Sequence, residues 1–119
     1  MTDEQTAQVL KQFNQAFLNH DPSLLGGLLA DDCILENSAP APNGSRHVGR
    51  AACLEFWSNI ASNKEASFQP EETWVAGDRG VIRWRLRWGP SDDESVRGVN
   101  VMRLRDGLIV EGMGYVKGA

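Results

Sequence analysis

The first part of the chain has hydrophobic residues at a helical period. Thr2 and Gln5 have the spacing of a capping box, in which two side chains and two backbone N–H groups exchange hydrogen bonds. Asp3 and Glu4 then lie where they face the positive end of a helix dipole. The apolar residues that share one helical face are Val9, Leu10, Phe13, Ala16 and Phe17. We therefore predict an N-terminal helix that packs this face against the domain.

Two further helices are predicted before residue 63. Asp21 suits an N-cap and Pro22 the first helical position, which predicts a short helix from Pro22 to about Leu29. Leu54, Trp57, Ile60 and Ala61 have helical spacing and predict a third helix from about Arg50 to Ser62. Between these helices, Cys33–Asn37 has strand length, and the Pro-, Asn- and Gly-rich segment Ser38–Ser45 predicts a loop.

From Ser67 onward the hydrophobic period changes to two. In the segment 81–88 (VIRWRLRW) large apolar residues alternate with arginines, which is typical of a strand with one buried and one exposed face. Turn-forming residues divide this half into about four antiparallel strands. The turns are centred near Gly77, Pro90 and Asp106–Gly107, and the last two strands are predicted at Val96–Arg105 and Leu108–Lys117. This order indicates an α+β domain, not a parallel doubly wound sheet.

Length and charge narrow the class of protein. The 119 residues suit one domain, which we expect to span residues 1–119. No segment has the roughly 20 apolar residues of a membrane-spanning helix, and the N-terminus is acidic where a signal peptide is basic. We therefore expect a cytoplasmic protein with no membrane partner. A formal net charge of −4 argues against a nucleic-acid partner.

Motifs for cofactor chemistry do not occur in the sequence. It contains no dinucleotide-binding GxGxxG, no phosphate-binding P-loop, no HExxH and no EF-hand loop. We therefore expect neither a cofactor nor a metal. Cys33 and Cys53 lack the short paired spacing of a zinc site, so we predict that both are buried free thiols.

Several segments carry a resemblance to a known family. They are LLADDCILEN at 28–37, GRAACLEFW at 49–57, the turn 77–79 and RGVNVMRLRDGLIVEGMGYVKG at 97–118. They resemble the SnoaL-like group of the nuclear transport factor 2-like (NTF2-like), ketosteroid isomerase-like superfamily. The resemblance implies a cystatin-like cone of three N-terminal helices on a strongly curved antiparallel sheet, with a deep pocket and usually a dimer. Such proteins include isomerases, polyketide cyclases, epoxide hydrolases, dehydratases and non-enzymatic binders, so no single activity is implied.

The resemblance to ketosteroid isomerase can be followed residue by residue. It places Phe13 where that enzyme has its oxyanion tyrosine, Asn37 at the aspartate base and Asn100 at the second, protonated aspartate. Phenylalanine has no hydroxyl and a carboxamide is too weak a base at neutral pH, so we do not expect classical isomerase activity. Asn37 and Asn100 are candidates to donate hydrogen bonds to a carbonyl; the alternative is two structural asparagines. His47 is a candidate acid or base at the pocket mouth; the alternative is an exposed loop histidine.

Strand alternation and the resemblance together extend the candidate pocket. On the arginine-rich strand the inward set is Ile82, Trp84, Leu86 and Trp88. The two glycines of the last strand are expected to widen the cavity, and the tryptophans either form walls for a flat apolar ligand or pack the core. The candidate ligand-binding residues are Phe13, Phe17, Leu35, Trp57, Trp74, Trp84, Met102, Gly112, Gly114 and Val116.

The opposite face of the same strand carries the arginines. The resemblance places a homodimer interface on this outer face, where the arginines are expected to pair with Glu71, Glu72 or Glu111 across the interface. An anion-binding surface is the alternative.

Two functional hypotheses follow from these residues. The first is a protein that binds a small hydrophobic molecule and catalyses isomerisation, cyclisation, hydration or hydrolysis without a cofactor, by orienting the substrate and polarising its carbonyl. The second is a non-catalytic dimeric binding or interaction module that has lost its acid and base residues. A pH-dependent rate would favour the first, and affinity that is flat with pH the second.

Overall fold

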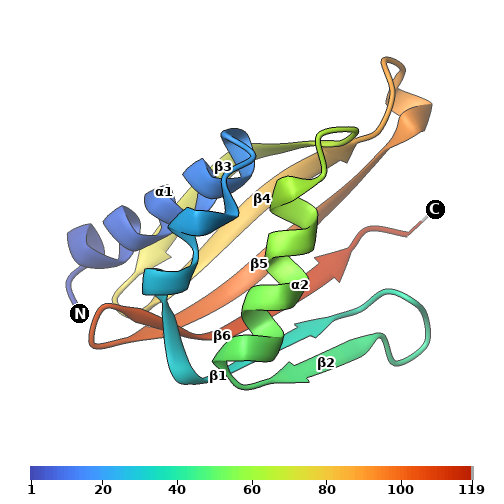
Figure 1. The fold of residues 1–119 in the computed structure, drawn as a ribbon. Helices are drawn as coiled ribbons and strands as arrows, with labels where there is room; N and C mark the ends of the chain where they lie inside the picture. Colours follow the sequence, from blue (N-terminus) through green and yellow to red (C-terminus); the bar gives the residue numbers. More distant parts are fainter. Residues whose placement is uncertain (119) are drawn as a thin grey trace.

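The chain folds into one curved sheet that carries two α-helices on its concave side (Figure 1). The computed structural model describes residues 1–118, so the last residue of the domain expected over 1–119 lies outside the described residues. The elements of the described chain are α1 (Asp3–Leu18), η1 (Pro22–Leu24), η2 (Gly26–Leu28), β1 (Leu29–Asn37), β2 (Ser45–Val48), α2 (Arg50–Ser62), β3 (Ser67–Ala76), β4 (Arg79–Arg87), η3 (Asp92–Glu94), β5 (Ser95–Arg105) and β6 (Leu108–Val116).

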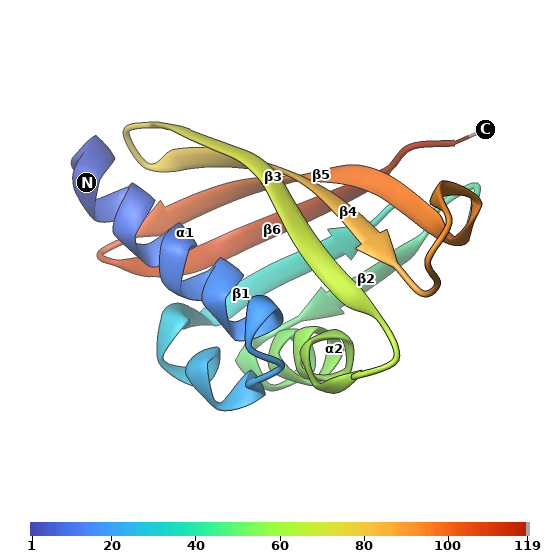
Figure 2. The same cartoon turned by 90° about the horizontal axis from the view of Figure 1, so that it is seen from above.

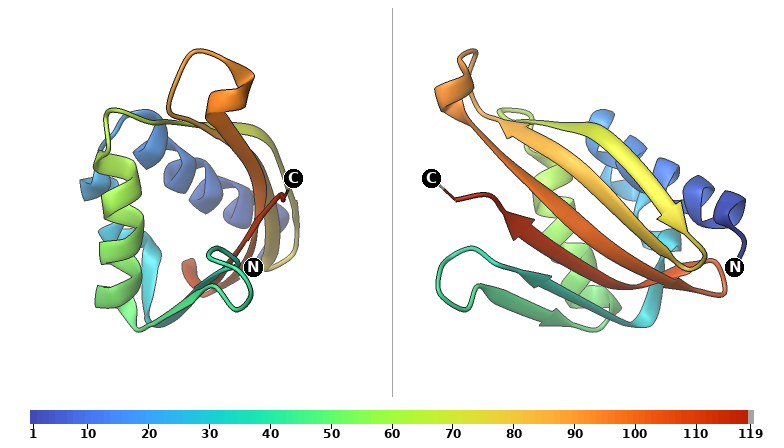
Figure 3. Two further views of the ribbon diagram at one scale, coloured as in Figure 1. Left: turned by 90° about the vertical axis from the view of Figure 1, so that its right-hand side faces the viewer. Right: turned by 180° about the vertical axis from the view of Figure 1, so that it is seen from behind.

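The six strands form one sheet in the order β2-β1-β6-β5-β4-β3. Neighbouring strands are antiparallel except β1 and β6, which are parallel. Seen from above, the sheet twists strongly, and α1 and α2 cover different parts of its concave side (Figure 2). In the left-hand view of Figure 3 both helices lie on the same side of the bent sheet. The expected α+β class and curved sheet are therefore confirmed.

Two details of the expected fold are wrong. The sheet is mixed and not purely antiparallel, because β1 enters beside β6 in the parallel direction. The helix expected from Pro22 to about Leu29 is two short 3₁₀ turns, η1 and η2, and β1 already begins at Leu29. Gly26 and Gly27 favour this outcome, because glycine lowers the stability of an α-helix. The α-helices are thus separated by β1 and β2 and are not grouped at the N-terminus.

The N-terminal helix forms as its sequence predicts. The Thr2 hydroxyl accepts a hydrogen bond from the Gln5 N–H at 3.1 Å, and the Gln5 side chain accepts one from the Thr2 N–H at 3.0 Å. Asp3 also anchors the helix start to the β3–β4 turn, because its carboxylate accepts a hydrogen bond from the Gly77 N–H at 2.7 Å. The apolar face of α1 then packs Leu10 and Phe13 into the core without any solvent exposure.

The C-terminal half is the predicted meander of four strands, β3 to β6. The Asp106–Gly107 turn between β5 and β6 is confirmed, and both residues have positive φ, 53° and 83°, as a two-residue hairpin of type I′ requires. One strand was not predicted from the sequence. β2 has only four residues and pairs with β1 alone, so its pattern is too short to show a period of two.

The core lies between the sheet and the two helices. Cys33 on β1 and Cys53 on α2 are both buried within it as free thiols, which confirms the prediction for the cysteines. Burial raises the pKa of the Cys33 thiol to about 12 and also raises the pKa of Cys53. Among the described residues, no helix is long and apolar enough to cross a membrane.

Candidate functional site

A cavity of about 190 Å³ lies between the concave face of the sheet and α2. Its walls are mostly aromatic and aliphatic side chains, with two asparagine side chains among them. The lining residues are Phe17, Asn37, Ala39, Phe56, Trp57, Ile60, Phe68, Trp84, Leu86, Val96, Asn100 and Val116. A much smaller space of about 10 Å³ adjoins it and shares Asn37, Phe56, Trp57 and Asn100. Apolar walls with a few convergent polar groups are typical of a small-molecule site.

Larger hollows lie elsewhere on the surface. One of about 670 Å³ is lined by residues near Met1 and Asp106, one of about 510 Å³ lies between α1 and β3, and one of about 410 Å³ lies on the outer face of the sheet. The hollow between α1 and β3 also holds amide side chains, but none of the three hollows lies between the concave face of the sheet and α2 or contains the candidate residues Asn37 and Asn100. The cavity beside α2 is therefore the candidate functional site.

Aromatic rings fix the inner walls of the cavity. The ring of Phe13 meets that of Trp57 edge to face, with centroids 4.9 Å apart, and the ring of Phe68 lies 5.7 Å from that of Trp84. Trp57 occupies the space above Gly112, where an added Cβ would lie 2.6 Å from the indole. The expectation that Gly112 widens the cavity is therefore wrong, because the ring of Trp57 fills the room that this glycine leaves.

The two asparagines reach the cavity from strands on either side of Gly114. In the sheet register, Asn37 on β1 and Asn100 on β5 are each paired with Gly114 on β6. A Cβ added at Gly114 would lie 3.2 Å from Asn100 Oδ1 and 3.6 Å from Asn37 Nδ2. The missing side chain of Gly114 therefore gives the two amides the space in which they approach each other.

Hydrogen bonds to obligate donors determine the orientation of both amides. The Trp84 indole N–H donates to Asn100 Oδ1 at 3.1 Å, and the Ala39 backbone N–H donates to Asn37 Oδ1 at 3.0 Å. Because indole and backbone N–H groups only donate, each amide oxygen must be on the side of its partner. Within residues 1–118, no group accepts a hydrogen bond from Nδ2 of Asn37 or Asn100. Both Nδ2 groups remain as donors.

The structure brings together most of the predicted site. Phe17, Asn37, Trp57, Trp84, Asn100 and Val116 line the cavity, and Leu35, Gly112 and Gly114 line the small adjoining space. Phe13 and Met102 line neither space. Both are fully buried, with 0% exposure, and contribute to the core behind the wall.

Trp74 does not lie in the cavity. Its side chain is 48% exposed and borders the groove between α1 and β3. The reason is a register shift in β3 between Pro70 and Glu72, which breaks the alternation of faces. Trp74 is consequently paired with Val81 of β4, whereas the inward-facing Ile82 is paired with Thr73. The sequence pattern alone gave no sign of this bulge.

His47 lies beside the cavity wall and not in the cavity. It is on β2, where it pairs with Leu35, and its ring centroid lies 4.7 Å from that of Phe56. Its Nε2 is 3.2 Å from the Ser45 hydroxyl. Since Phe56 itself lines the cavity, this aromatic ring separates the imidazole from the site. None of the described residues that line the cavity carries a carboxylate or an imidazole. Glu36 lines the adjoining space, but its carboxylate lies 3.8 Å from the Arg46 guanidinium on the surface.

Five lining residues were not singled out from the sequence as site residues: Ala39, Phe56, Ile60, Phe68 and Val96. Leu86 was placed in the inward set of the arginine-rich strand, and it does line the cavity. Val96 could then be found as the cross-strand partner of Leu86. Ala39 lies in the loop after β1, where residues follow no helical or strand period, so the sequence did not indicate that it lines the cavity.

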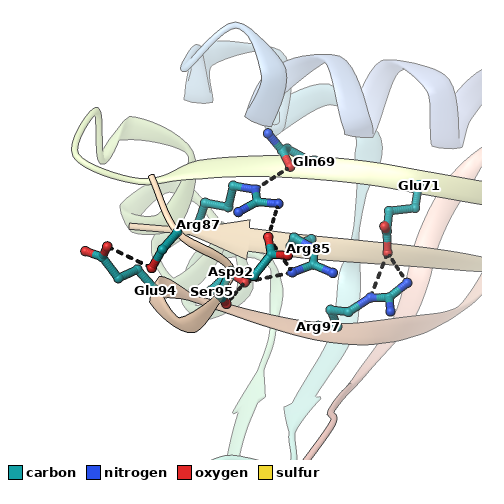
Figure 4. A network of polar contacts seen from close by, with 9 residues as sticks. Gln69, Glu71, Arg85, Arg87, Asp92, Glu94, Ser95 and Arg97 are labelled. Carbon is teal, nitrogen blue, oxygen red and sulfur yellow. Dashed lines mark hydrogen bonds and ion pairs between the residues drawn. The ribbon is translucent and has the colours of Figure 1, made fainter. Parts of the chain in front are cut away.

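The arginines of β4 and β5 form ion pairs within the chain. Arg97 donates to Glu71 at 3.0 Å, and both Arg85 and Arg87 approach Asp92 in η3 (Figure 4). The hydrogen bond from Arg87 lowers the pKa of Asp92. The expected carboxylate partners Glu72 and Glu111 pair with Arg83 at 3.4 Å and Arg103 at 2.7 Å. These pairs do not require an interface. In the described part of the chain, no cluster of three or more His, Cys, Asp or Glu residues is arranged to hold a metal.

An α+β cone with an apolar cavity between a bent sheet and its helices defines the class of this protein. A family model for the SnoaL-like domain matches residues 10–112, and the chain belongs to this family. The chain is similar to the crystal structure of an NTF2-like protein of unknown function from Mesorhizobium loti, with 54% identity and a TM-score of 0.90 over 98% of this chain and 93% of that one.

Two more distant structures share the fold. A proposed ketosteroid isomerase from Kribbella flavida has 20% identity and a TM-score of 0.81, over 98% of this chain and 81% of that one. An epoxide hydrolase from Mycobacterium tuberculosis has 20% identity and a TM-score of 0.72, over 98% of this chain and 83% of that one. No curated protein matches the sequence. At these identities the likeness concerns the fold alone.

Proposed function

We propose that this protein binds a small, largely apolar carbonyl compound in the cavity beside α2. The carbonyl oxygen lies between Asn37 and Asn100 and accepts hydrogen bonds from their Nδ2 groups. The apolar remainder of the ligand contacts Trp57, Trp84 and Phe56. The observation that carries the proposal is the orientation of the two amides, whose oxygens are already occupied by the N–H groups of Ala39 and Trp84.

The surroundings favour a neutral carbonyl over a carboxylate. Among the residues that line the cavity, as far as the structure describes the chain, none carries a positive charge. Transfer of an anion into an apolar site without a cation is costly, whereas a neutral oxygen loses little when two donors replace water. The site would therefore select ligands that have a neutral acceptor oxygen at one end and are otherwise apolar.

Acetophenone and α-methylstyrene provide the direct test, because they differ mainly in C=O against C=CH₂. We expect the protein to bind acetophenone at least about tenfold more tightly in calorimetric titrations. Two hydrogen bonds that each contribute about 0.5–1.5 kcal/mol net of solvation together supply the roughly 1.4 kcal/mol that a tenfold difference requires. Asn37→Ala and Asn100→Ala should each lower the affinity for acetophenone and leave that for α-methylstyrene nearly unchanged.

Asn59→Ala is the matched control, since Asn59 is an exposed asparagine on α2 outside the cavity lining. It should bind both probes like the unmodified protein, and circular dichroism should show that all three variants fold. Equal affinity for the two probes, or loss of both in the same proportion, would show that the amides do not recognise the carbonyl. No binding of either probe would refute the proposed function itself.

A cofactor-independent isomerase, cyclase, hydratase or hydrolase is the second candidate function. Asn37 and Asn100 each bring a free Nδ2 donor to the same cavity, and such donors are able to stabilise an oxyanion, which supports such chemistry. It also needs a proton-transfer group, and His47 behind Phe56 is the residue to test. Turnover that depends on pH and is lost in His47→Gln would favour an enzyme. Binding without turnover would favour the non-catalytic module, which the lack of acids and bases among the lining residues supports.

We also infer that two copies associate through the outer face of the sheet. Val81, Val101 and Met113 are cross-strand neighbours on this face, and Tyr115 beyond them is 55% exposed. Partly exposed apolar residues in one patch are typical of an association surface. Native mass spectrometry should then show a dimer, and Val101→Arg should yield a monomer. A monomeric unmodified protein would refute this inference.

A further inference from the structure

The apolar row on the concave face of β4 emerges gradually from the core. Alternate residues of this row are Ile82, Trp84, Leu86 and Trp88, and their exposure rises from 0% at Ile82 and 7% at Trp84 to 54% at Trp88, with Leu86 half-buried. Trp84 and Leu86 line the cavity, so Trp88 is the next member of the row beyond the cavity wall. A large apolar side chain thus lies exposed at the end of the strand that leads out of the site.

Trp88 is held on an ordered hairpin. Its N–H donates to the Glu94 carbonyl at 3.0 Å, so the β4–β5 pairing continues past Leu86 and Val96. The connection beyond it projects from the sheet in Figure 1, and polar contacts around Asp92 and Ser95 hold it together (Figure 4). Arg87 donates to Asp92 at 2.8 Å, and the Ser95 hydroxyl donates to the Asp92 carbonyl at 2.7 Å. These contacts fix the backbone on which the exposed indole is carried.

The inner cavity is small for a ligand site. Its volume of about 190 Å³ is below the roughly 300–1,000 Å³ of most small-molecule pockets. Ile82 is paired with Asn100, and Trp88 lies six positions further along the chain, which is roughly 20 Å at the rise of a strand. Because Leu86 lines the cavity and Trp88 follows it in the row, a molecule that holds its carbonyl at Asn100 and exceeds the cavity volume can extend past Leu86 toward Trp88.

We infer that Trp88 is the outer wall of the ligand site and selects elongated carbonyl compounds. The carbonyl end lies at Asn37 and Asn100, the middle of the molecule fills the cavity, and the apolar distal end lies against the indole of Trp88. This inference rests on the proposed function and adds to it the shape of the ligand. It also gives the exposed tryptophan a role that core packing does not, because more than half of its surface faces solvent.

A series of para-alkylacetophenones tests the inference. Acetophenone itself fits the inner cavity, and the para-butyl and para-octyl compounds extend progressively outward. We expect the affinity of the unmodified protein to rise by up to about fourfold for each methylene that becomes buried. In Trp88→Ala the affinity for acetophenone should stay unchanged, while most of the gain from butyl to octyl should disappear. Trp88→Phe should recover much of that gain.

Trp74→Ala is the matched control, because Trp74 is 48% exposed but lies outside the cavity. It should show the chain-length dependence of the unmodified protein. If Trp88→Ala keeps the full gain, or if the octyl compound binds the unmodified protein no better than acetophenone does, the inference about Trp88 is wrong while the carbonyl site stands. If no compound of the series binds at all, the proposed function fails as well. Thermal unfolding monitored by circular dichroism would show that each variant is folded.

Discussion

The indole N–H of Trp84 on β4 donates a hydrogen bond to Asn100 Oδ1 on β5 at 3.1 Å. This contact does more than satisfy a half-buried amide. Because the oxygen is held by the indole, the Nδ2 group of Asn100 is left to donate elsewhere. Trp84 thus determines that Asn100 presents a hydrogen-bond donor, and not an acceptor, to the cavity.

Trp84→Phe should therefore weaken carbonyl recognition even though it keeps an aromatic ring in the wall. Loss of one net hydrogen bond, about 0.5–1.5 kcal/mol, corresponds to roughly a two- to tenfold lower affinity for acetophenone. Trp57→Phe is the control, because Trp57 also lines the cavity and its indole N–H makes no hydrogen bond within residues 1–118. Calorimetry on both variants would measure the difference. Equal losses would mean that ring size and not amide orientation matters.

The close fit of Trp57 over Gly112 leads to a prediction about stability. A Cβ at this glycine would lie 2.6 Å and 2.7 Å from two indole carbons, so Gly112→Ala forces the ring or the strand to move. Such overpacking lowers the free energy of unfolding by about 1–3 kcal/mol. Gly27→Ala is the control, because nothing lies within 4 Å of a Cβ built there. Urea unfolding curves of the two variants would show the contrast, and an unchanged midpoint for Gly112→Ala would contradict the packing described.

The sequence predicted the parts of this fold that depend on local period and turn chemistry. The capping box of Thr2, the Asp106–Gly107 turn and the alternation along β4 are all determined by neighbouring residues, and all three form. The prediction failed for Trp74, because the bulge after Pro70 shifts the faces of β3 by one residue. A bulge depends on how two strands pair, which the pattern of one strand does not contain.

The candidate site likewise has features that the sequence predicted and features that it did not. Asn37 and Asn100 were found through the family resemblance, and the structure places both at the cavity. The resemblance did not reveal which amide atoms face the cavity, because that depends on a neighbouring indole and a loop N–H. His47 was expected at the mouth, yet the ring of Phe56 on α2 lies in between. The orientation of the amides and the position of His47 depend on side-chain contacts between different elements. The pattern of residues along the sequence does not reveal these contacts.

The ion pair between Asp32 and Arg105 predicts a dependence of stability on pH. Arg105 donates to both carboxylate oxygens of Asp32, at 3.1 Å and 2.7 Å, and this lowers the pKa of Asp32 below its ordinary value of 3.8. A lowered native pKa means that the stabilisation is complete above the unfolded-state pKa and is lost as the pH falls through the native one. Because the pair is exposed, the effect should be small and sensitive to salt.

Asp32→Asn should accordingly unfold at slightly lower urea concentration than the unmodified protein at pH 7, and the two midpoints should converge toward pH 2. The neighbouring Asp31→Asn provides the control, since the exposed Asp31 makes no ion pair with any described residue. A difference between Asp32→Asn and the unmodified protein that persists unchanged at pH 2 would show that the Asp32 carboxylate stabilises the fold by something other than its charge.

The buried thiols should be inert in the folded protein. Cys33 and Cys53 have no exposed surface, and burial raises the pKa of both, that of Cys33 to about 12. Alkylation requires the thiolate, which is therefore scarce at pH 8 as well as inaccessible. We expect intact-mass spectra after iodoacetamide treatment at pH 8 to show no adduct on the native protein and two adducts in guanidinium.

Rapid labelling of the native protein would instead mean that α2 separates readily from β1. Cys53 is covered by the contact between these two elements, and its Sγ lies 3.4 Å from the Cys33 carbonyl oxygen. Since α2 also carries Trp57 and Phe56 of the cavity wall, such labelling would show that the site opens by movement of this helix.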